Sequence, residues 1–392
     1  MKKKAVPLYL FSFSMIMPII AVIPLLPMIR DEISASYSQI SIFVACLGIV
    51  RILFAFPSGF LADRFDRKKI LLLSGFLNVS GLLILSSSRT IFHLIVSRIL
   101  IGTGSIICTV TILVVLAQTA DPERKGSMLS MNNVAHSAGG IITPALAGIL
   151  AGWYNWRVPF LVLAGLILLS MIAIAVTFSD ERPDYKKGED PGGTETNSSL
   201  RKTKRAGIFE LAPIFAISLF VFFYRSSFRH TLIPFYGKDV FHVDVVVLGF
   251  YISLMGSVAM LSIFVFGFLS DRYGRKAVLI SGISFSTIAM LGLLLPREWN
   301  PLLMACIFVG VGAAINSMPN ILISDTAPSD SLGRMMGINR IFADSGYFLG
   351  AIIVGNLLDH FGFRVPLYAV TGFSLFTLAF ACFCVQNKPI KS

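Results

Sequence analysis

Several ionisable side chains lie inside long apolar stretches of this 392-residue chain. Burying such a group in a membrane costs several kcal/mol unless it faces protein or water, so each one is a functional candidate. A guanidinium offers paired donors to a carboxylate or phosphate, and a carboxyl or imidazole group can carry a proton. The residues concerned are Arg51, Arg98, His136, Arg225, Arg229, His230, Arg340 and Asp344.

Some of these residues form pairs spaced four apart, which places both members on one face of a helix. The pairs are Asn132 with His136, Arg225 with Arg229, Asn316 with Asn320, and Arg340 with Asp344. Arginine outnumbers aspartate inside the stretches, so a cavity lined by them should attract anions. We therefore predict that substrate is bound by Arg51, Arg225, Arg229, Asn132, His136, Asn316 and Asn320.

Asp344 is the candidate proton carrier, with Arg340 as its partner and His136 as the fallback, because imidazole titrates nearest neutral pH. Plainer alternatives stay open for each group. Arg340 and Asp344 could simply neutralise each other, and His136 could be a packing residue. Arg229 and His230 could lie near the outer rim, where a long side chain reaches water.

Membrane-spanning helices must position these residues, because apolar residues make up 55% of the chain and charged residues only 14%. About 20 uncharged apolar residues cross the hydrocarbon core as a helix, which satisfies its own backbone hydrogen bonds. The five cysteines all fall inside such runs without paired spacing, so we expect neither a disulfide nor a metal site. The predicted spans are 5–29, 39–60, 70–87, 91–118, 128–152, 158–178, 209–235, 246–268, 277–295, 301–324, 335–357 and 365–385.

Basic residues are distributed unequally between the two sides of these spans. Most of the 33 Lys and Arg fall on the side of the termini, so the positive-inside rule places both termini in the cytoplasm of a cell (plasma or inner) membrane. This distribution explains the net charge of +12 and excludes nucleic acid as a partner. The first apolar run is too long for a signal peptide, so it should remain as a helix. The external loops carry Arg30, Arg89, Arg157, Lys238, Arg297 and Arg364.

A polar segment, 179–207, divides the chain into two similar parts, 1–178 and 208–392. Its mixed charges with Pro, Gly and Ser predict a flexible cytoplasmic linker. GFLADRFDRKK at 59–69 matches GFLSDRYGRKA at 267–277, and Gln118-Thr119-Ala120 matches Asp325-Thr326-Ala327. Six spans per part give both parts one orientation, so we predict an all-α protein with two six-helix bundles related by a pseudo-two-fold axis along the membrane normal.

This repeated loop motif, G-x-x-x-D-R-x-G-R-K, resembles that of the major facilitator superfamily, and the resemblance covers essentially the whole chain. It implies twelve helices and a cytoplasmic gate, in which carboxylates at helix ends meet guanidinium groups. Asp66 stands where the family has glycine, so the first copy could turn differently. The gating residues are Gly59, Asp63, Arg64 and Arg67, then Gly267, Asp271, Arg272, Gly274 and Arg275.

Three further motifs refine the resemblance. Arg98, followed by Gly102 and Gly104, is similar to a family pattern associated with proton coupling. The Pro24–Pro27 pair resembles that of twelve-helix drug–proton antiporters. Gly140, Pro144 and Gly148 resemble the antiporter motif of the fifth helix, although Thr143 and Ala147 replace two of its glycines. These motifs favour an exporter over an importer.

The sequence thus predicts a monomeric transporter that exports a small amphipathic or anionic organic molecule, with lipid, substrate and protons as its partners. The proton gradient would supply the energy without a cofactor, since no nucleotide-binding motif is present. The nearest alternative is an importer of an organic anion. A membrane-embedded enzyme is disfavoured because the five histidines are scattered. A receptor would need no arginine at mid-span.

Overall fold

The structure is a computed structural model that describes residues 2–119, 125–178, 208–295, 299–327 and 331–384. All of its described elements are helices, as the apolar runs predict. Eleven of these helical segments are long and apolar enough to cross a membrane. The expected ninth span corresponds to helix α10 (Arg275–Gly292), whose 18 residues include a basic pair in the first turn. The predicted linker lies outside the described residues.

The first group of helices covers the first part of the chain. Helix α3 packs on α4 and α6, and α1 packs on α5. Helix α2 starts at a capping box, in which Ser36 and Gln39 satisfy each other's backbone N–H groups. The bounds are α1 Lys2–Ile33, α2 Tyr37–Arg64, α3 Arg67–Ser86, α4 Ile91–Thr119, α5 Lys125–Trp153 and α6 Val158–Thr177.

The second group has less regular helices. One span changes from α-helix to π-helix at η1 and again at η2, and another passes through the 3₁₀ turn η4. Such irregular segments inside long helices are frequent at functional sites. The bounds are α7 Ile208–Tyr224, η1 Arg225–Leu232, α8 Ile233–Phe235, η2 Tyr236–Val240, α9 Val245–Tyr273, α11 Pro301–Gly312, η4 Ala313–Asn316, α12 Met318–Thr326, α13 Leu332–Phe361 and α14 Arg364–Cys384.

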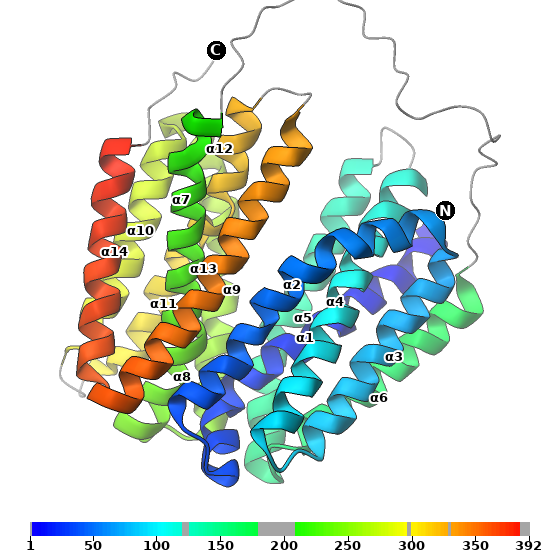
Figure 1. Cartoon of the computed structure of the whole chain (residues 1–392), viewed down its shortest axis with the longest axis horizontal. Helices are drawn as coiled ribbons and strands as arrows, with labels where there is room; N and C mark the ends of the chain where they lie inside the picture. Colours follow the sequence, from blue (N-terminus) through cyan, green and yellow to red (C-terminus); the bar gives the residue numbers. More distant parts are fainter. Residues whose placement is uncertain (1, 120–124, 179–207, 296–298, 328–330, 385–392) are drawn as a thin grey trace, which may run out of the picture.

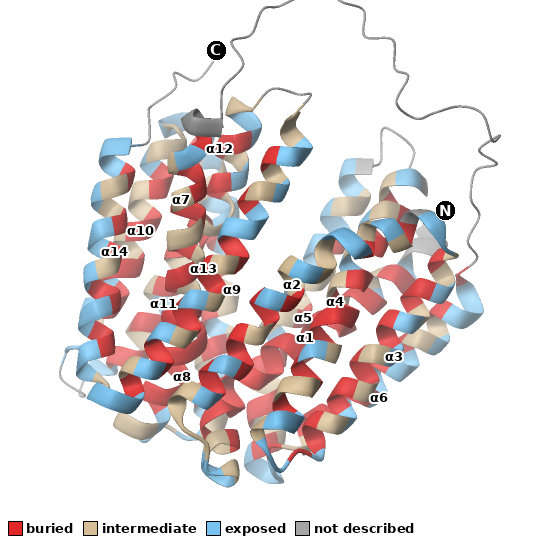
Figure 2. Ribbon diagram, viewed as in Figure 1, coloured by how far each residue is buried: buried red, intermediate tan, exposed pale blue. Residues whose placement is uncertain are grey.

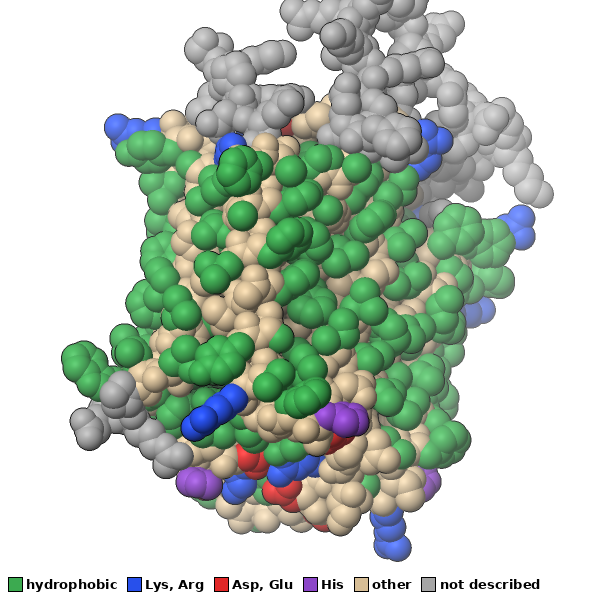
Figure 3. All heavy atoms as spheres, turned by 60° about the vertical axis from the view of Figure 1, so that its left-hand side comes forward, with side chains coloured by type: hydrophobic (Ala, Val, Ile, Leu, Met, Phe, Trp, Pro, Cys, Tyr) green, Lys and Arg blue, Asp and Glu red, His purple; other side chains and the backbone are tan. Residues whose placement is uncertain are grey.

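The two groups lie side by side, with α3 and α6 at one outer side and α10 and α14 at the other (Figure 1). Buried residues concentrate on the inward helix faces, and exposed residues follow the outer faces (Figure 2). On the surface, apolar side chains cover a broad middle zone and charged side chains gather near the ends (Figure 3). This zoning is what a lipid bilayer requires of a protein that crosses it.

The two groups touch through α2 with α13 and α5 with α9. They diverge toward the end of the molecule where α1 begins and α14 ends (Figure 1). At the opposite end, Arg30 of α1 pairs with Asp239 of η2 at 2.5 Å. Tyr37 also donates its hydroxyl proton to Asp239 at 2.8 Å. This conformation is therefore closed at one end by contacts between the groups.

Helices α5 and α9 cross closely near this closed end. A Cβ atom at Gly148 would lie 2.7 Å from the carbonyl oxygen of Val245, and one at Gly249 would lie 2.5 Å from that of Pro144. Glycine is thus required for the two backbones to approach this far. The backbone N–H of Ala145 also donates to Ser253 at 2.9 Å. The helix-five motif therefore forms part of the contact between the two groups.

Candidate functional site

A cavity of about 280 Å³ lies between the two groups of helices. One wall comes from α1, α2, α4 and α5, and the other from α7, η1 and α13. Met15, Ile16, Ile19 and Ile20 of α1 give it an apolar side. Its polar lining consists of Ser12, Arg51, Ser105, Thr109, His136, Arg225, His230, Arg340 and Tyr347.

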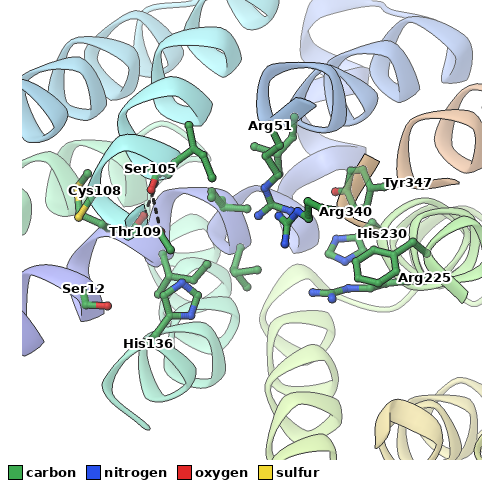
Figure 4. Close-up of a pocket in the computed structure, with 17 residues that line it drawn as sticks. Ser12, Arg51, Ser105, Cys108, Thr109, His136, Arg225, His230, Arg340 and Tyr347 are labelled. Carbon is green, nitrogen blue, oxygen red and sulfur yellow. Dashed lines mark hydrogen bonds between the residues drawn. The ribbon is translucent and has the colours of Figure 1, made fainter. Parts of the chain in front are cut away.

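Arg51 and Arg225 line this cavity from opposite groups, as the sequence predicts from their positions in the two halves. Arg340 of α13 joins them, and His136 faces them from the α5 wall (Figure 4). Arg225 lies near the ring of Phe222 at 5.7 Å. Three guanidinium groups and an apolar wall can hold a molecule with an anionic head and an apolar body.

Asp344 lies behind the arginines and is fully buried. Its Oδ2 accepts a hydrogen bond from Nε of Arg340 at 2.6 Å, as the spacing of four predicts. Its Oδ1 lies 3.9 Å from Nη1 of Arg51 and accepts no hydrogen bond from the residues described. Helices α2 and α13 can approach this closely because residue 48, one turn before Arg51, is glycine. A Cβ at Gly48 would lie only 2.8 Å from the carbonyl oxygen of Asp344. Asp344 therefore links a residue of its own helix to one of the other group.

The histidines of the site occupy the cavity wall. His230 is buried, and its ring meets that of Tyr347 edge-on at 5.5 Å. Its Nε2 is enclosed without a hydrogen-bond partner among the described residues. Arg229 and His230 each line a cavity between helices, which favours a role in the site over the alternative placement at the outer rim.

Arg229 lines a second, smaller cavity that it shares with Arg225. The sequence places both arginines on one helix face, which assumes α-helical geometry. In η1 the hydrogen bonds run to the fifth residue, so Arg229 and His230 both lie one turn beyond Arg225, on either side of it. This is why Arg225 and His230 line the large cavity together.

The three asparagines do not line the large cavity. Asn132 is buried in α5. Asn316 lines the smaller cavity, and Asn320 accepts a hydrogen bond from Asn339 at 2.8 Å. The 3₁₀ turn η4 and Pro319 interrupt the helix between Asn316 and Asn320, so their spacing of four does not give a shared face. Their predicted role in substrate binding stays a prediction.

Arg98 is almost completely buried and lies outside the lining of the cavity. Its guanidinium carbon is 5.1 Å from the ring centre of Phe43, and it interacts with the hydroxyl of Tyr347 from the other group. Tyr347 is not among the site residues predicted from the sequence. Its signal is the spacing of Arg340, Asp344 and Tyr347 at positions i, i+4 and i+7 of one helix face.

The second copy of the gating motif forms an ionic cluster within its own group. Nη1 of Arg275 lies 2.6 Å from Asp271, and its Nε lies 3.2 Å from Asp325 at the end of α12. Arg272 lies against the ring of Tyr273 at 5.7 Å. A Cβ at Gly267 would meet nothing within 4 Å, so no close contact requires glycine at this position in the present conformation.

The first copy differs, as the substitution of its glycine suggests. Asp66 has a φ of −58° and accepts hydrogen bonds from the backbone N–H groups of Lys68 and Lys69. Gly274, at the matching position, has a φ of +91°, which favours glycine. Arg67 donates to Gln118, the counterpart of Asp325, so an arginine-to-helix-end contact occurs in both copies.

The remaining gating-motif residues that the structure describes make few contacts in this conformation. Arg64 lies 4.7 Å from the ring centre of Phe60. A Cβ at Gly59 or at Gly140 of the helix-five motif would meet nothing within 4 Å. The side chain of Asp63 lies outside those that the structure describes.

Solved structures share this architecture. The chain superposes on a mutant of the nucleoside transporter NupG with a TM-score of 0.79 and 13% identity, covering 98% of this chain and 100% of that one. It superposes on an inward-facing, occupied bacterial homologue of the human lysosomal transporter Spinster with a TM-score of 0.77 and 16% identity, covering 97% and 96%. At these identities the likeness shows the fold alone.

Curated relatives and a family model match nearly the whole chain. It is 25% identical over 373 residues to the multi-drug resistance efflux pump PmrA of Streptococcus pneumoniae, covering 92% of this chain and 90% of that protein. It is 23% identical over 383 residues to the multidrug resistance protein MdtG of Escherichia coli, covering 94% and 91%. The family model matches residues 8–265 and 214–392. Together with a cavity between two groups of membrane helices, this match shows that the chain belongs to the Major Facilitator Superfamily.

Proposed function

We propose that this membrane transporter has twelve spans, with α10 as the ninth, in two six-helix halves that are joined by residues 179–207. The contact of Arg67 with Gln118 and that of Arg275 with Asp325 support a pseudo-two-fold relation along the membrane normal. The distribution of Lys and Arg supports cytoplasmic termini. The closed end would then face outward and the cavity would open to the cytoplasm.

The chain is proposed to export a small amphipathic or anionic organic molecule by alternating access, driven by the proton gradient. The observation that carries this proposal is the convergence of Arg51 and Arg225 from opposite halves on one cavity. An anion held by both guanidinium groups would tie its binding to the rocking of the halves. The direction is supported by the likeness to PmrA and MdtG, whose names describe multidrug resistance proteins.

Asp344 is the proposed proton site. Its carboxylate faces Arg340 on its own helix and Arg51 on the other half, so its ionised form favours the present contact between the halves. Protonation would remove that charge and weaken the contact. Proton transfer would in this way change the relative stability of the two conformations.

The position of Asp344 also favours a second candidate, import of an organic anion together with a proton. Ionised Asp344 competes with an anionic substrate for Arg51 and Arg340, so protonation should strengthen anion binding. Cotransport of proton and anion follows most simply from that sign. An exporter driven by the same gradient needs the opposite coupling: the loaded transporter must move unprotonated, and the empty transporter must return only when it is protonated.

Proteoliposomes with an imposed pH gradient separate the two candidates. Inside-out protein in vesicles with an acidic lumen should accumulate substrate if it is a proton-coupled exporter. An importer should lose substrate from the lumen under the same gradient. Substrate accumulation that stays the same when the pH gradient is imposed in either direction would refute proton coupling.

A further inference from the structure

The smaller cavity, of about 20 Å³, lies entirely inside the second group of helices. Its walls come from α7, η1, α10, α11 and η4, and Arg225 forms the partition between it and the large cavity. Its volume matches one water molecule or one monatomic ion. No organic substrate fits a space of this size. The polar residues that line it are Tyr224, Arg225, Arg229, Ser286 and Asn316.

Arg229 carries a charge that nothing in the described structure neutralises. It makes no ion pair or hydrogen bond with any residue described, and its Nε is enclosed. The groups that act on it electrostatically are the thiol of Cys306 and the hydroxyls of Tyr224 and Tyr347, and none of them is a carboxylate. Arginine stays protonated in proteins, and Arg229 is half-buried with its Nε enclosed, so an anion or several acceptors beside it would stabilise the charge.

The other lining groups do not supply those acceptors. Tyr224 donates its hydroxyl proton to the carbonyl oxygen of Ser286, and Ser286 donates its own to Gly282. The Asn316 amide donates to Ala313 at 2.7 Å. The Nε of Arg225 is also enclosed without a partner, and the carboxylate nearest to it, Asp344, is bonded to Arg340. The field in the cavity is therefore positive, which excludes a cation.

We propose that the smaller cavity binds a single halide ion, chloride under cellular conditions, between the guanidinium groups of Arg229 and Arg225. The ion neutralises Arg229 and, because Arg225 lines both cavities, orients the same side chain that faces the substrate. Halide occupancy would thereby modulate the affinity of the large cavity for anions. The binding site itself does not depend on the proposed transport activity.

The test uses the purified full-length protein, exchanged into sodium gluconate, and measures thermal unfolding as chloride or bromide replaces gluconate at constant ionic strength. A ligand that binds the folded state raises the midpoint in proportion to the logarithm of its concentration above its Kd. We expect that rise in the wild type and in Arg334→Gln, an exposed arginine of α13 that serves as the matched control. Arg229→Gln should lose it.

A second variant tests the proposal even if Arg229→Gln does not fold. Asn316→Asp places a fixed carboxylate in the cavity wall, where it should replace the ion. This variant should be at least as stable in gluconate as the wild type and should not respond to halide. A wild type that unfolds at the same temperature in gluconate and in halide would show that water occupies the cavity. Full halide dependence in Arg229→Gln would place the ion elsewhere, and either result overturns the proposal.

Discussion

Replacing Asp344 with Asn tests how proton and substrate share one set of arginines. The carboxylate is fully buried, 2.6 Å from Arg340 and 3.9 Å from Arg51. An anion on the far side of either guanidinium would lie about 7 Å from the carboxylate, given ordinary hydrogen-bond lengths on both sides of the guanidinium. At an effective dielectric constant of about 20, the repulsion between the two charges amounts to about 2 kcal/mol.

Removing that repulsion should strengthen anion binding in Asp344→Asn about thirtyfold. Asparagine retains the volume and can accept the hydrogen bond from Arg340, so the fold should be preserved. The sign of the pH effect follows from the same interaction. Any rise of wild-type affinity on acidification that comes from loss of this carboxylate charge should be absent in the variant, because asparagine carries no charge.

Equilibrium binding of a carboxylate panel, repeated at several pH values, measures both effects. Asp244→Asn is the matched control, because Asp244 caps α9 at the exposed surface and asparagine caps helices equally well. It should leave affinity and pH dependence unchanged. Wild-type affinity together with a retained pH dependence in Asp344→Asn would refute the assignment and transfer the proton to His136, Asp63 or Asp325.

Four further changes probe the gate and the closed end. Asp271→Asn removes the ion pair with Arg275, so transport should fall at equal expression, with Asp63→Asn tested beside it; normal rates in both would refute the gate. Gly148→Ala would place a methyl group against the α9 backbone and destabilise the present conformation. Cysteine labelling from the closed end of the molecule should therefore increase. Asp239→Asn removes the partner of Arg30 in the second group and should shift labelling in the same direction; unchanged labelling would show that this pair does not hold the closed end together.

Periodicity and the internal repeat predicted much of this fold from the sequence. The apolar runs fixed where helices occur, and the assignment of Arg51 and Arg225 to different halves placed them on opposite walls of one cavity. Asp66 in place of glycine correctly indicated a different turn in the first loop. These features are local or follow from the repeat, so they can be derived without coordinates.

Other parts of the site depend on backbone irregularities that no spacing rule anticipates. The π-helix η1 places His230 beside Arg225 and turns Arg229 toward a second cavity. The 3₁₀ turn η4 separates Asn316 from Asn320. An α-helical spacing argument fails at both places because tertiary packing, and not the local sequence, decides where a long helix changes its winding.

The central claim is that Arg51 and Arg225 together bind an anionic substrate group, and the most direct test is anion affinity in Arg51→Gln and Arg225→Gln. A charge-assisted hydrogen bond contributes about 1.5–3 kcal/mol, so either change should weaken carboxylate, sulfonate or phosphate ligands about ten- to a hundredfold. Arg51→Lys and Arg225→Lys should lie between, because lysine keeps the charge and loses the paired donors. Neutral compounds and the control Arg334→Gln should change little. Unchanged anion affinity in both glutamine variants, or a wild-type preference for lipophilic cations, would contradict the account.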